Sequence, residues 1–227
     1  MSSPAAMTDV QLRISDDPAA EVGALLAASA LAGETIVLTG GSAVGEAYEH
    51  AAELKDWSAA SVWWGDERCV PATDELSNYA LAKRTLLDRL DGQPHVHRIR
   101  GELAPAEAAA EYERELEGVE LDLLLLGLGS DGHVASLFAG SPQLAERERL
   151  VTSGPAGLEP WVDRVTLTLP VLLAAPRTVF LVAGGDKAEA VARAFAGPIT
   201  DEVPATLLRQ GDGPIVAYLD RAAASLL

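Results

Sequence analysis

The sequence predicts an α/β fold in which a doubly wound, mainly parallel sheet is flanked by helices. Short apolar segments of strand length alternate with longer, often alanine-rich segments of helix length, and strands separated by helices usually lie parallel in one sheet. Several apolar segments end directly in glycine, as at Gly40, Gly127 and Gly184. In such sheets the loops beyond the carboxyl ends of the strands carry the ligand site.

The first half of the chain begins with a predicted helix–strand unit. Residues 18–32 are rich in alanine and leucine, with Asp16 or Asp17 as the expected N-cap. The β-branched residues 35–39 predict a strand, which Gly40-Gly41-Ser42 ends. The further elements expected in this half are a helix at 44–54, a strand at 60–64, a helix at 75–90, a short strand at 95–99 and a helix at 105–117.

The second half begins with the leucine run 121–126, which predicts a long buried strand. A loop with three glycines, an aspartate and a histidine follows it, and the small residues after the histidine indicate the start of a helix. Residues 164–169 alternate polar and apolar side chains, as a half-exposed strand would. The remaining elements expected are a buried strand at 178–183, a helix at 186–196 and a last strand at 214–219.

Length and composition limit the classes of protein to which the chain can belong. A chain of 227 residues suits a single domain, 1–227, in which the Gly- and Pro-containing segment 139–160 is expected to border the site. The net charge of −17 argues against nucleic acid and anionic membrane surfaces as partners. No apolar run is long enough for a membrane helix, Met1 to Asp9 lack a signal-peptide pattern, and Cys69 is the single cysteine. We therefore expect a cytoplasmic location.

The first candidate loop is Thr39-Gly40-Gly41-Ser42, between a strand and a helix. Backbone N–H groups at the start of a helix attract anions, and glycine lets a ligand approach the backbone closely. The alternative is a plain tight turn, because short glycine-rich turns are common in α/β folds. From this loop alone both interpretations stay open.

The second candidate loop is Gly65-Asp66-Glu67-Arg68-Cys69, which follows two tryptophans. Arginine offers planar, bidentate donors for a phosphate or a carboxylate. The alternative is a surface pair of Glu67 with Arg68, which would contribute little. Cys69 has no histidine near it in the sequence, and a lone thiol is more often inert.

The third and most informative loop runs from Gly127 to Phe138 and contains Asp131 and His133. Histidine titrates near neutral pH, so it can take a proton from water and return it to a leaving group. Asp131 is placed to orient the imidazole ring or to bind a substrate hydroxyl. The alternative is a structural histidine, but a glycine-rich loop after a buried strand favours a functional one.

The remaining candidates are weaker. Lys187 follows Gly184-Gly185-Asp186 and is placed to contact an anion, although it could equally be a solvated lysine. Arg164 opens a strand and is either a site residue or an edge charge. His95 and His97 lie two positions apart, but no further histidine or cysteine supports a metal site, and none is predicted.

Taken in order, the motifs resemble those of the 6-phosphogluconolactonases of the glucosamine-6-phosphate isomerase/6-phosphogluconolactonase family. The resemblance extends from about residue 35 to residue 209. Its most specific part is the segment Gly127-Leu128-Gly129-Ser130-Asp131-Gly132-His133-Val134-Ala135-Ser136-Leu137-Phe138. The other parts are Thr39-Gly40-Gly41-Ser42, Asp66-Glu67-Arg68, Asn78, Arg164-Val165-Thr166-Leu167, Gly185-Asp186-Lys187 and Pro204-Ala205-Thr206.

The sister enzymes, the glucosamine-6-phosphate deaminases and isomerases, resemble the chain at the same glycine loop and at Asp-Gly-His. They typically follow the histidine with a segment that supplies a catalytic glutamate, whereas here no acid follows His133 until Glu146. The resemblance therefore favours the lactonases. A non-catalytic sugar-phosphate sensor on the same fold is a further alternative, although a sensor has no need of His133.

The resemblance also has two departures. The lactonase glycine loop commonly reads Ser-Gly-Gly-Ser-Thr-Pro, whereas this chain has Thr39 at its first position and Ala43-Val44 at its end. Ala43 lacks a hydroxyl and with it one hydrogen bond to the phosphate, worth about 1 kcal/mol. Thr206 stands where the family has serine and keeps the hydroxyl.

The resemblance implies hydrolysis of 6-phospho-D-glucono-1,5-lactone to 6-phospho-D-gluconate in the oxidative pentose phosphate pathway. In this hypothesis His133 is the general base for water and Asp131 positions the ring or the substrate. The substrate phosphate would be bound by Gly40, Gly41, Ser42, Arg68, Lys187 and Arg164. A lactone is already a reactive ester, so no metal or organic cofactor is expected. The expected partner is the small sugar-phosphate lactone, and the chain is expected to be a monomer or a homodimer.

Overall fold

The structure is a computed structural model that describes residues 8–227, so the first seven residues of the predicted domain 1–227 lie outside the described part. The strands are β1 Val10–Ser15, β2 Thr35–Leu38, β3 Ser61–Trp64, β4 Asp66–Arg68, β5 His95–Val96, β6 Leu123–Leu126, β7 Val151–Gly154, β8 Arg164–Leu167, β9 Thr178–Val182 and β10 Ile215–Asp220. The helices are α1 Pro18–Leu31, α2 Ser42–Ala51, α3 Asn78–Thr85, α4 Pro105–Leu116, α5 Pro142–Ala145, α6 Leu169–Leu173 and α7 Ala188–Val191.

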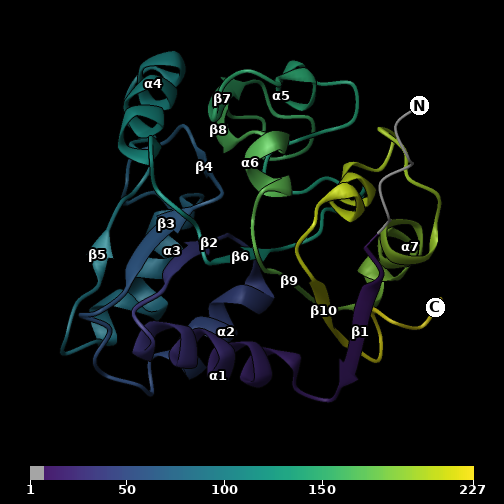
Figure 1. Ribbon diagram of the computed structural model, residues 1–227, viewed down its shortest axis with the longest axis horizontal. Helices are drawn as coiled ribbons and strands as arrows, with labels where there is room; N and C mark the ends of the chain where they lie inside the picture. Colours follow the sequence, from purple (N-terminus) through teal and green to yellow (C-terminus); the bar gives the residue numbers. More distant parts are fainter. Residues whose placement is uncertain (1–7) are drawn as a thin grey trace.

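Seven strands form one parallel sheet in the order β1-β10-β9-β6-β2-β3-β5 (Figure 1). Every residue of β6 and β9 is buried, which explains why these segments are continuously apolar. The predicted doubly wound, mainly parallel sheet with flanking helices is therefore confirmed. None of the helices between residues 8 and 227 has the length and apolar character needed to cross a bilayer.

The order of the strands fixes where a ligand can bind. β2 pairs with β3 on one side and with β6 on the other, so the loop after β2 and the loop after β6 start from neighbouring strand ends. In an open parallel sheet this switch point is the usual ligand crevice. α2 follows the loop after β2 and packs against α1, and the two helices lie side by side along the lower side of Figure 1.

A second, antiparallel sheet of three strands, in the order β4-β8-β7, stands on the carboxyl side of the large sheet. α4 packs against β7 and β8, on the upper side of Figure 1. The sequence did not predict β4 or β7, nor did it predict the edge strand β1. The expectation of a half-exposed strand at 164–169 is wrong, because all four residues of β8 are buried between neighbouring strands, α4 and the loop after β6.

Two predicted helices are shorter than expected. In the segment 75–90, α3 begins at Asn78 with Ser77 as its N-cap, and a separate 3₁₀ turn, Leu87–Arg89, follows it. In the segment 186–196, the 3₁₀ turn Gly185–Lys187 and the π-helical turn Ala192–Ala196 flank the four residues of α7. The other predicted elements agree with the structure to within about three residues at each end.

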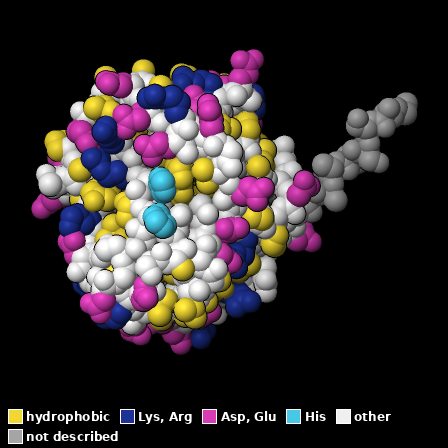
Figure 2. Space-filling view, turned by 60° about the vertical axis from the view of Figure 1, so that its left-hand side comes forward, with side chains coloured by type: hydrophobic (Ala, Val, Ile, Leu, Met, Phe, Trp, Pro, Cys, Tyr) yellow, Lys and Arg dark blue, Asp and Glu magenta, His cyan; other side chains and the backbone are white. Residues whose placement is uncertain are grey.

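Charged side chains of both signs are mixed on the face of the molecule that Figure 2 presents, around two histidines. Just after β5, the ring of His97 stacks on Trp63 with ring centroids 4.1 Å apart, and its Nδ1 lies 3.6 Å from the carboxylate of Glu115. His97 is thus a packing residue of the sheet edge.

Candidate functional site

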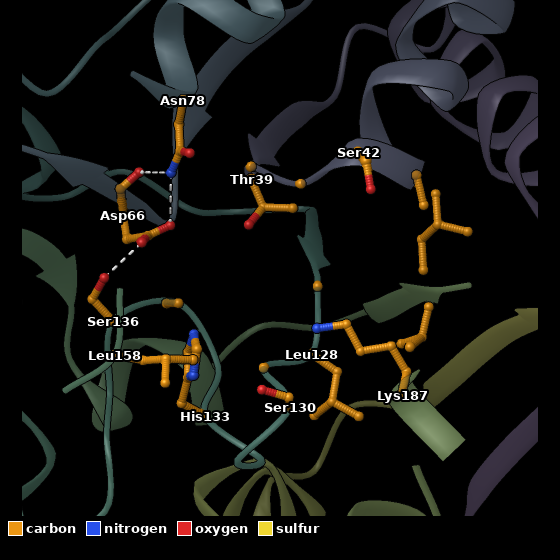
Figure 3. A pocket seen from close by; sticks show the side chains of 18 of the residues that line it. Thr39, Ser42, Asp66, Asn78, Leu128, Ser130, His133, Ser136, Leu158 and Lys187 are labelled. Carbon is orange, nitrogen blue, oxygen red and sulfur yellow. Dashed lines mark hydrogen bonds between the residues drawn. The ribbon is translucent and has the colours of Figure 1, made fainter. Parts of the chain in front are cut away.

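A cavity of about 280 Å³ opens at the carboxyl ends of β2, β6 and β9, at the switch point of the sheet. Its walls come from the loop after β2, from β4 and the start of α3, from the loop after β6, from residues 158–159 and from the turn after β9 (Figure 3). The predicted site residues that line it are Gly40, Gly41, Ser42, Arg68, His133, Arg164 and Lys187, and Asp131 contacts His133. The topology thus brings together all the residues that the sequence selected.

The loop between β2 and α2 presents backbone to the cavity. Gly40 lies so close to Asn78 that a Cβ at Gly40 would lie 1.9 Å from the Oδ1 atom of Asn78. α2 begins at Ser42, and no side chain caps its first N–H groups. Uncapped N–H groups at the start of a helix attract anions. This end of the cavity therefore suits a phosphate group.

Two arginines lie next to each other on neighbouring strands of the small sheet, and both line the cavity. Arg68 in β4 is the register partner of Arg164 in β8, and neither forms an ion pair with a carboxylate of residues 8–227. Burial lowers the pKa of Arg164, and the positive charge of Arg68 lowers it further. Two guanidinium groups without paired carboxylates favour the binding of an anion between or beside them.

The two guanidinium groups have different protein partners. Arg68 donates from Nη1 to the carbonyl oxygen of Leu76 at 2.6 Å, while its buried Nε has no hydrogen-bond partner within the described chain. Arg164 donates from Nη1 to Val162 at 2.7 Å and from Nη2 to Pro160 at 2.9 Å. Arg164 therefore also fixes the backbone of the segment whose Leu158 and Glu159 line the cavity.

Lys187 supplies a third positive charge to the cavity. It is the last residue of the 3₁₀ turn Gly185–Lys187, which begins three residues beyond the end of β9. Its ammonium group points from this turn toward the middle of the cavity (Figure 3). Lys187, Arg68 and the uncapped start of α2 form the cationic part of the cavity lining, which is called its cationic half below.

His133 and Asp131 form a close pair in the loop after β6. Nδ1 of His133 lies 2.6 Å from Oδ1 of Asp131, which also accepts the backbone N–H of His133 at 3.1 Å. Because an ionised carboxylate only accepts hydrogen bonds, this contact assigns the proton to Nδ1 and leaves Nε2 as an acceptor. Burial raises the pKa of Asp131, but the hydrogen bond and the charge of His133 outweigh it and leave that pKa below its usual value.

The packing around His133 fixes the orientation of its ring. A Cβ at Gly129 would lie 2.0 Å from Nδ1 of His133, so only glycine fits there. On its other side the ring packs against Phe138, with ring centroids 4.4 Å apart. A histidine that is held by a carboxylate and by packing, and that presents Nε2 to a cavity, is arranged to accept a proton from water.

The helix expected directly after His133 is absent from the described chain, and that prediction is wrong. Residues 134–137 instead form a tight turn, in which the N–H of Leu137 donates to the carbonyl oxygen of Val134 at 2.9 Å. Ala135 has a φ of 48°, in the left-handed region that a helix cannot accommodate. The turn places Ala135 and Ser136 in the cavity wall.

Among the polar residues of the cavity wall that were not selected from the sequence, Asp66, Asn78 and Ser136 form a hydrogen-bonded group. Asp66 is 5% exposed and accepts hydrogen bonds from Ser136 at 2.6 Å and from Asn78 at 3.1 Å (Figure 3). All three stand in the motifs that carry the family resemblance, which was the available signal. No sequence pattern pairs Asp66 with Ser136, because these residues meet only through the fold.

Glu67, between Asp66 and Arg68, is a buried carboxylate on the opposite side of β4. Its Oε1 accepts the N–H groups of Arg68 and Asn78 at 2.7 and 2.8 Å. Its Oε2 accepts the N–H of Tyr79 and the hydroxyl of Ser77 at 2.8 and 2.9 Å. Burial raises the pKa of Glu67, although these four hydrogen bonds oppose the rise. Glu67 therefore connects the start of α3 by hydrogen bonds to β4, the strand that carries Arg68.

Comparison with known proteins agrees with this architecture. Residues 15–217 match the family described as glucosamine-6-phosphate isomerases/6-phosphogluconolactonase. A probable 6-phosphogluconolactonase of Arabidopsis thaliana is 36% identical over 216 residues, with 85% of this chain and 81% of the plant protein covered. The 6-phosphogluconolactonase of Streptomyces coelicolor is 38% identical over 214 residues, with 85% and 82% covered.

Solved structures give the same fold. The 6-phosphogluconolactonase of Trypanosoma brucei superposes with a TM-score of 0.82 at 26% identity, covering 97% of this chain and 99% of that one. A monomeric glucosamine-6-phosphate deaminase superposes with a TM-score of 0.83 at 19% identity, covering 96% and 100%. At this identity the deaminase shows the shared fold alone.

The role of Glu67 leads to a prediction about stability. In Glu67→Gln the amide group replaces one carboxylate oxygen and directs its own N–H groups at backbone N–H donors, which leaves a buried donor without an acceptor. This should cost about 1–3 kcal/mol, or about 3–10 °C in Tm for a chain of this length. Glu49→Gln, which breaks a more exposed surface pair with Arg89, is the matched control and should shift Tm by less than about 2 °C. Equal shifts in calorimetry would contradict the assigned role of Glu67.

Proposed function

The chain belongs to the glucosamine-6-phosphate isomerase/6-phosphogluconolactonase family, and we propose that it hydrolyses 6-phospho-D-glucono-1,5-lactone to 6-phospho-D-gluconate with His133 as the general base. The reaction is a step of the oxidative pentose phosphate pathway. The observation that carries the proposal is one cavity that is lined both by His133, whose Nδ1 lies 2.6 Å from Asp131, and by cationic groups. A base and an anion site are the two parts that hydrolysis of a phosphorylated lactone requires.

In the proposed mechanism His133 transfers one proton twice. The oxygen of a water molecule attacks the lactone carbonyl carbon while Nε2 takes a proton from that water. The tetrahedral intermediate then collapses, the bond from the carbonyl carbon to the ring oxygen breaks, and Nε2 returns the proton to that oxygen. Asp131 holds the ring in the required tautomer and stabilises the imidazolium that forms between the two transfers. A lactone is a reactive ester, so the proposed mechanism uses no metal or organic cofactor.

The substrate phosphate is proposed to bind in the cationic half of the cavity. Lys187, Arg68 and the first N–H groups of α2 at Ser42 supply charge and donors there. Gly40 and Gly41 let the phosphate approach the backbone. Arg164 adds charge from the register position opposite Arg68, although two of its donors are already used by residues 160 and 162.

The remaining proposals concern the whole chain. We propose one domain, 1–227, whose segment 139–160 borders the site, since Leu158 and Glu159 line the cavity. A cytoplasmic location is supported by the single cysteine, Cys69. Size-exclusion chromatography with light scattering distinguishes the monomer from the homodimer that we propose as alternatives.

The direct test of the function is hydrolysis of freshly prepared lactone, followed through coupled oxidation of the 6-phosphogluconate formed, with the spontaneous rate subtracted. We expect His133→Ala to lower kcat about 10²–10⁴-fold, because the water then lacks its base. His95→Ala, at an exposed position on β5, is the control and should retain activity. A loss of less than about tenfold in His133→Ala would exclude the general-base role. If the wild type shows no activity but releases ammonia from glucosamine 6-phosphate, the sister activity holds instead.

A second prediction concerns Arg68. If its guanidinium binds the phosphate equally in the ground state and the transition state, Arg68→Ala should raise KM about 10–100-fold and change kcat little. Arg84→Ala removes the same charge from an exposed position outside the cavity wall and should leave KM unchanged. A fall in kcat with an unchanged KM would mean that Arg68 acts in the chemical step rather than in binding.

A further inference from the structure

Two buried tyrosine hydroxyls end neighbouring strands of the large sheet in the same way. Tyr48 of α2 accepts the N–H of Thr39 at 3.0 Å and donates its hydroxyl to the carbonyl oxygen of the same residue at 2.8 Å. Tyr112 of α4 does the same at Trp64, at 2.7 and 3.0 Å. Each hydroxyl thus satisfies both backbone groups of one residue.

Thr39 needs such a partner because the sheet ends just before it. The register of β2 with β3 ends at Leu38, and that with β6 ends at Val37. Thr39 is 4% exposed, so its N–H and C=O groups have little access to water and must be paired within the protein. Tyr48 supplies both bonds, and it does so from the helix that begins just beyond the glycine loop.

The contact between Tyr48 and Thr39 closes a loop of the chain. The backbone runs from Thr39 through Gly40 and Gly41 into α2, and the side chain of Tyr48, on the second turn of α2, bonds back to Thr39. Both ends of the glycine segment are therefore held by α2: one through the backbone and the other through the Tyr48 hydroxyl. Burial raises the pKa of Tyr48 far above that of a free phenol, so its hydroxyl stays protonated and can donate.

The strand end held by Tyr112 is secured differently. Beyond Trp64, the N–H of Gly65 donates to Leu38 and its carbonyl oxygen accepts the N–H of Leu167. The next three residues pair with β8 throughout β4. The backbone that carries Asp66 and Arg68 is therefore held by several hydrogen bonds besides those of Tyr112. Gly40 and Gly41 lie beyond the registers of β2 with β3 and β6. The two hydrogen bonds from Tyr48 to Thr39 are therefore the main interaction that holds this loop.

We propose that Tyr48 is the positioning residue of the anion site, because its hydroxyl sets the distance between the end of β2 and the uncapped start of α2. This inference rests on the proposed function in so far as the anion is the phosphate of the substrate. Tyr48 does not line the cavity, so it acts through the loop and not on the ligand. Preorganised backbone donors bind an anion without the entropic cost of ordering the loop.

The test compares Tyr48→Phe with Tyr112→Phe, two variants that each remove one buried hydroxyl and its two hydrogen bonds. Both keep the aromatic ring, so both should fold, with Tm lowered by about 3–10 °C. KM for the lactone should rise about tenfold in Tyr48→Phe, with kcat within about threefold of the wild type. In Tyr112→Phe, KM should stay within about twofold of the wild type. Similar KM values in the two variants would overturn the proposal.

Amide hydrogen exchange gives a readout that does not depend on activity. Backbone amides in peptides that cover residues 39–45 should exchange faster in Tyr48→Phe than in the wild type or in Tyr112→Phe, because the loop has lost the two hydrogen bonds from Tyr48 to Thr39. Unchanged exchange there would also overturn the proposal. A wild type without lactonase activity would overturn the proposed function, and the exchange measurement would then decide the role of Tyr48 by itself.

Discussion

The architecture of the site follows from one constraint: backbone groups that leave a buried parallel sheet must still be hydrogen-bonded. At the carboxyl ends of β2 and β3 the sheet ladder stops while the chain is still buried. The protein meets the constraint with side chains. Tyr48 and Tyr112 reach back from helices later in the chain and pair with Thr39 and Trp64, whereas Glu67 of β4 reaches forward and pairs with the first turn of α3. The loops between these contacts can therefore present backbone and charge to a cavity without collapsing into it.

The electrostatics of the site contrast with those of the whole chain. The net charge is −17, yet Arg68, Arg164 and Lys187 surround the cavity without a paired carboxylate from the described residues. Unpaired guanidinium groups are costly when they are partly desolvated, and a bound anion repays that cost. In the proposed function this focused charge distinguishes the phosphorylated lactone from a neutral one, which gains nothing from it.

Much of this could be predicted from the sequence, because the inner strands of the large sheet are apolar runs and the loop after β6 is a local motif. β4 could not be predicted in the same way, because Asp66-Glu67-Arg68 has no strand-like pattern and forms a strand only by pairing with β8. The helix expected after His133 failed because a left-handed turn at Ala135 brings Ser136 to Asp66. These failures concern contacts between segments 70 or more residues apart, which local propensity does not encode.

The close packing behind the loops has a consequence for protein engineering. The space beside Gly40 is filled by Asn78 and the space beside Gly129 by the His133 ring, so neither loop tolerates a new side chain. Residues 158 and 159, by contrast, reach the cavity from a segment whose backbone Arg164 holds at residues 160 and 162, and Leu158 is 36% exposed. Libraries that aim to change the accepted sugar should therefore vary this segment and leave the two glycine loops untouched. The scaffold thus separates two loops that are fixed by packing from a segment that design can vary.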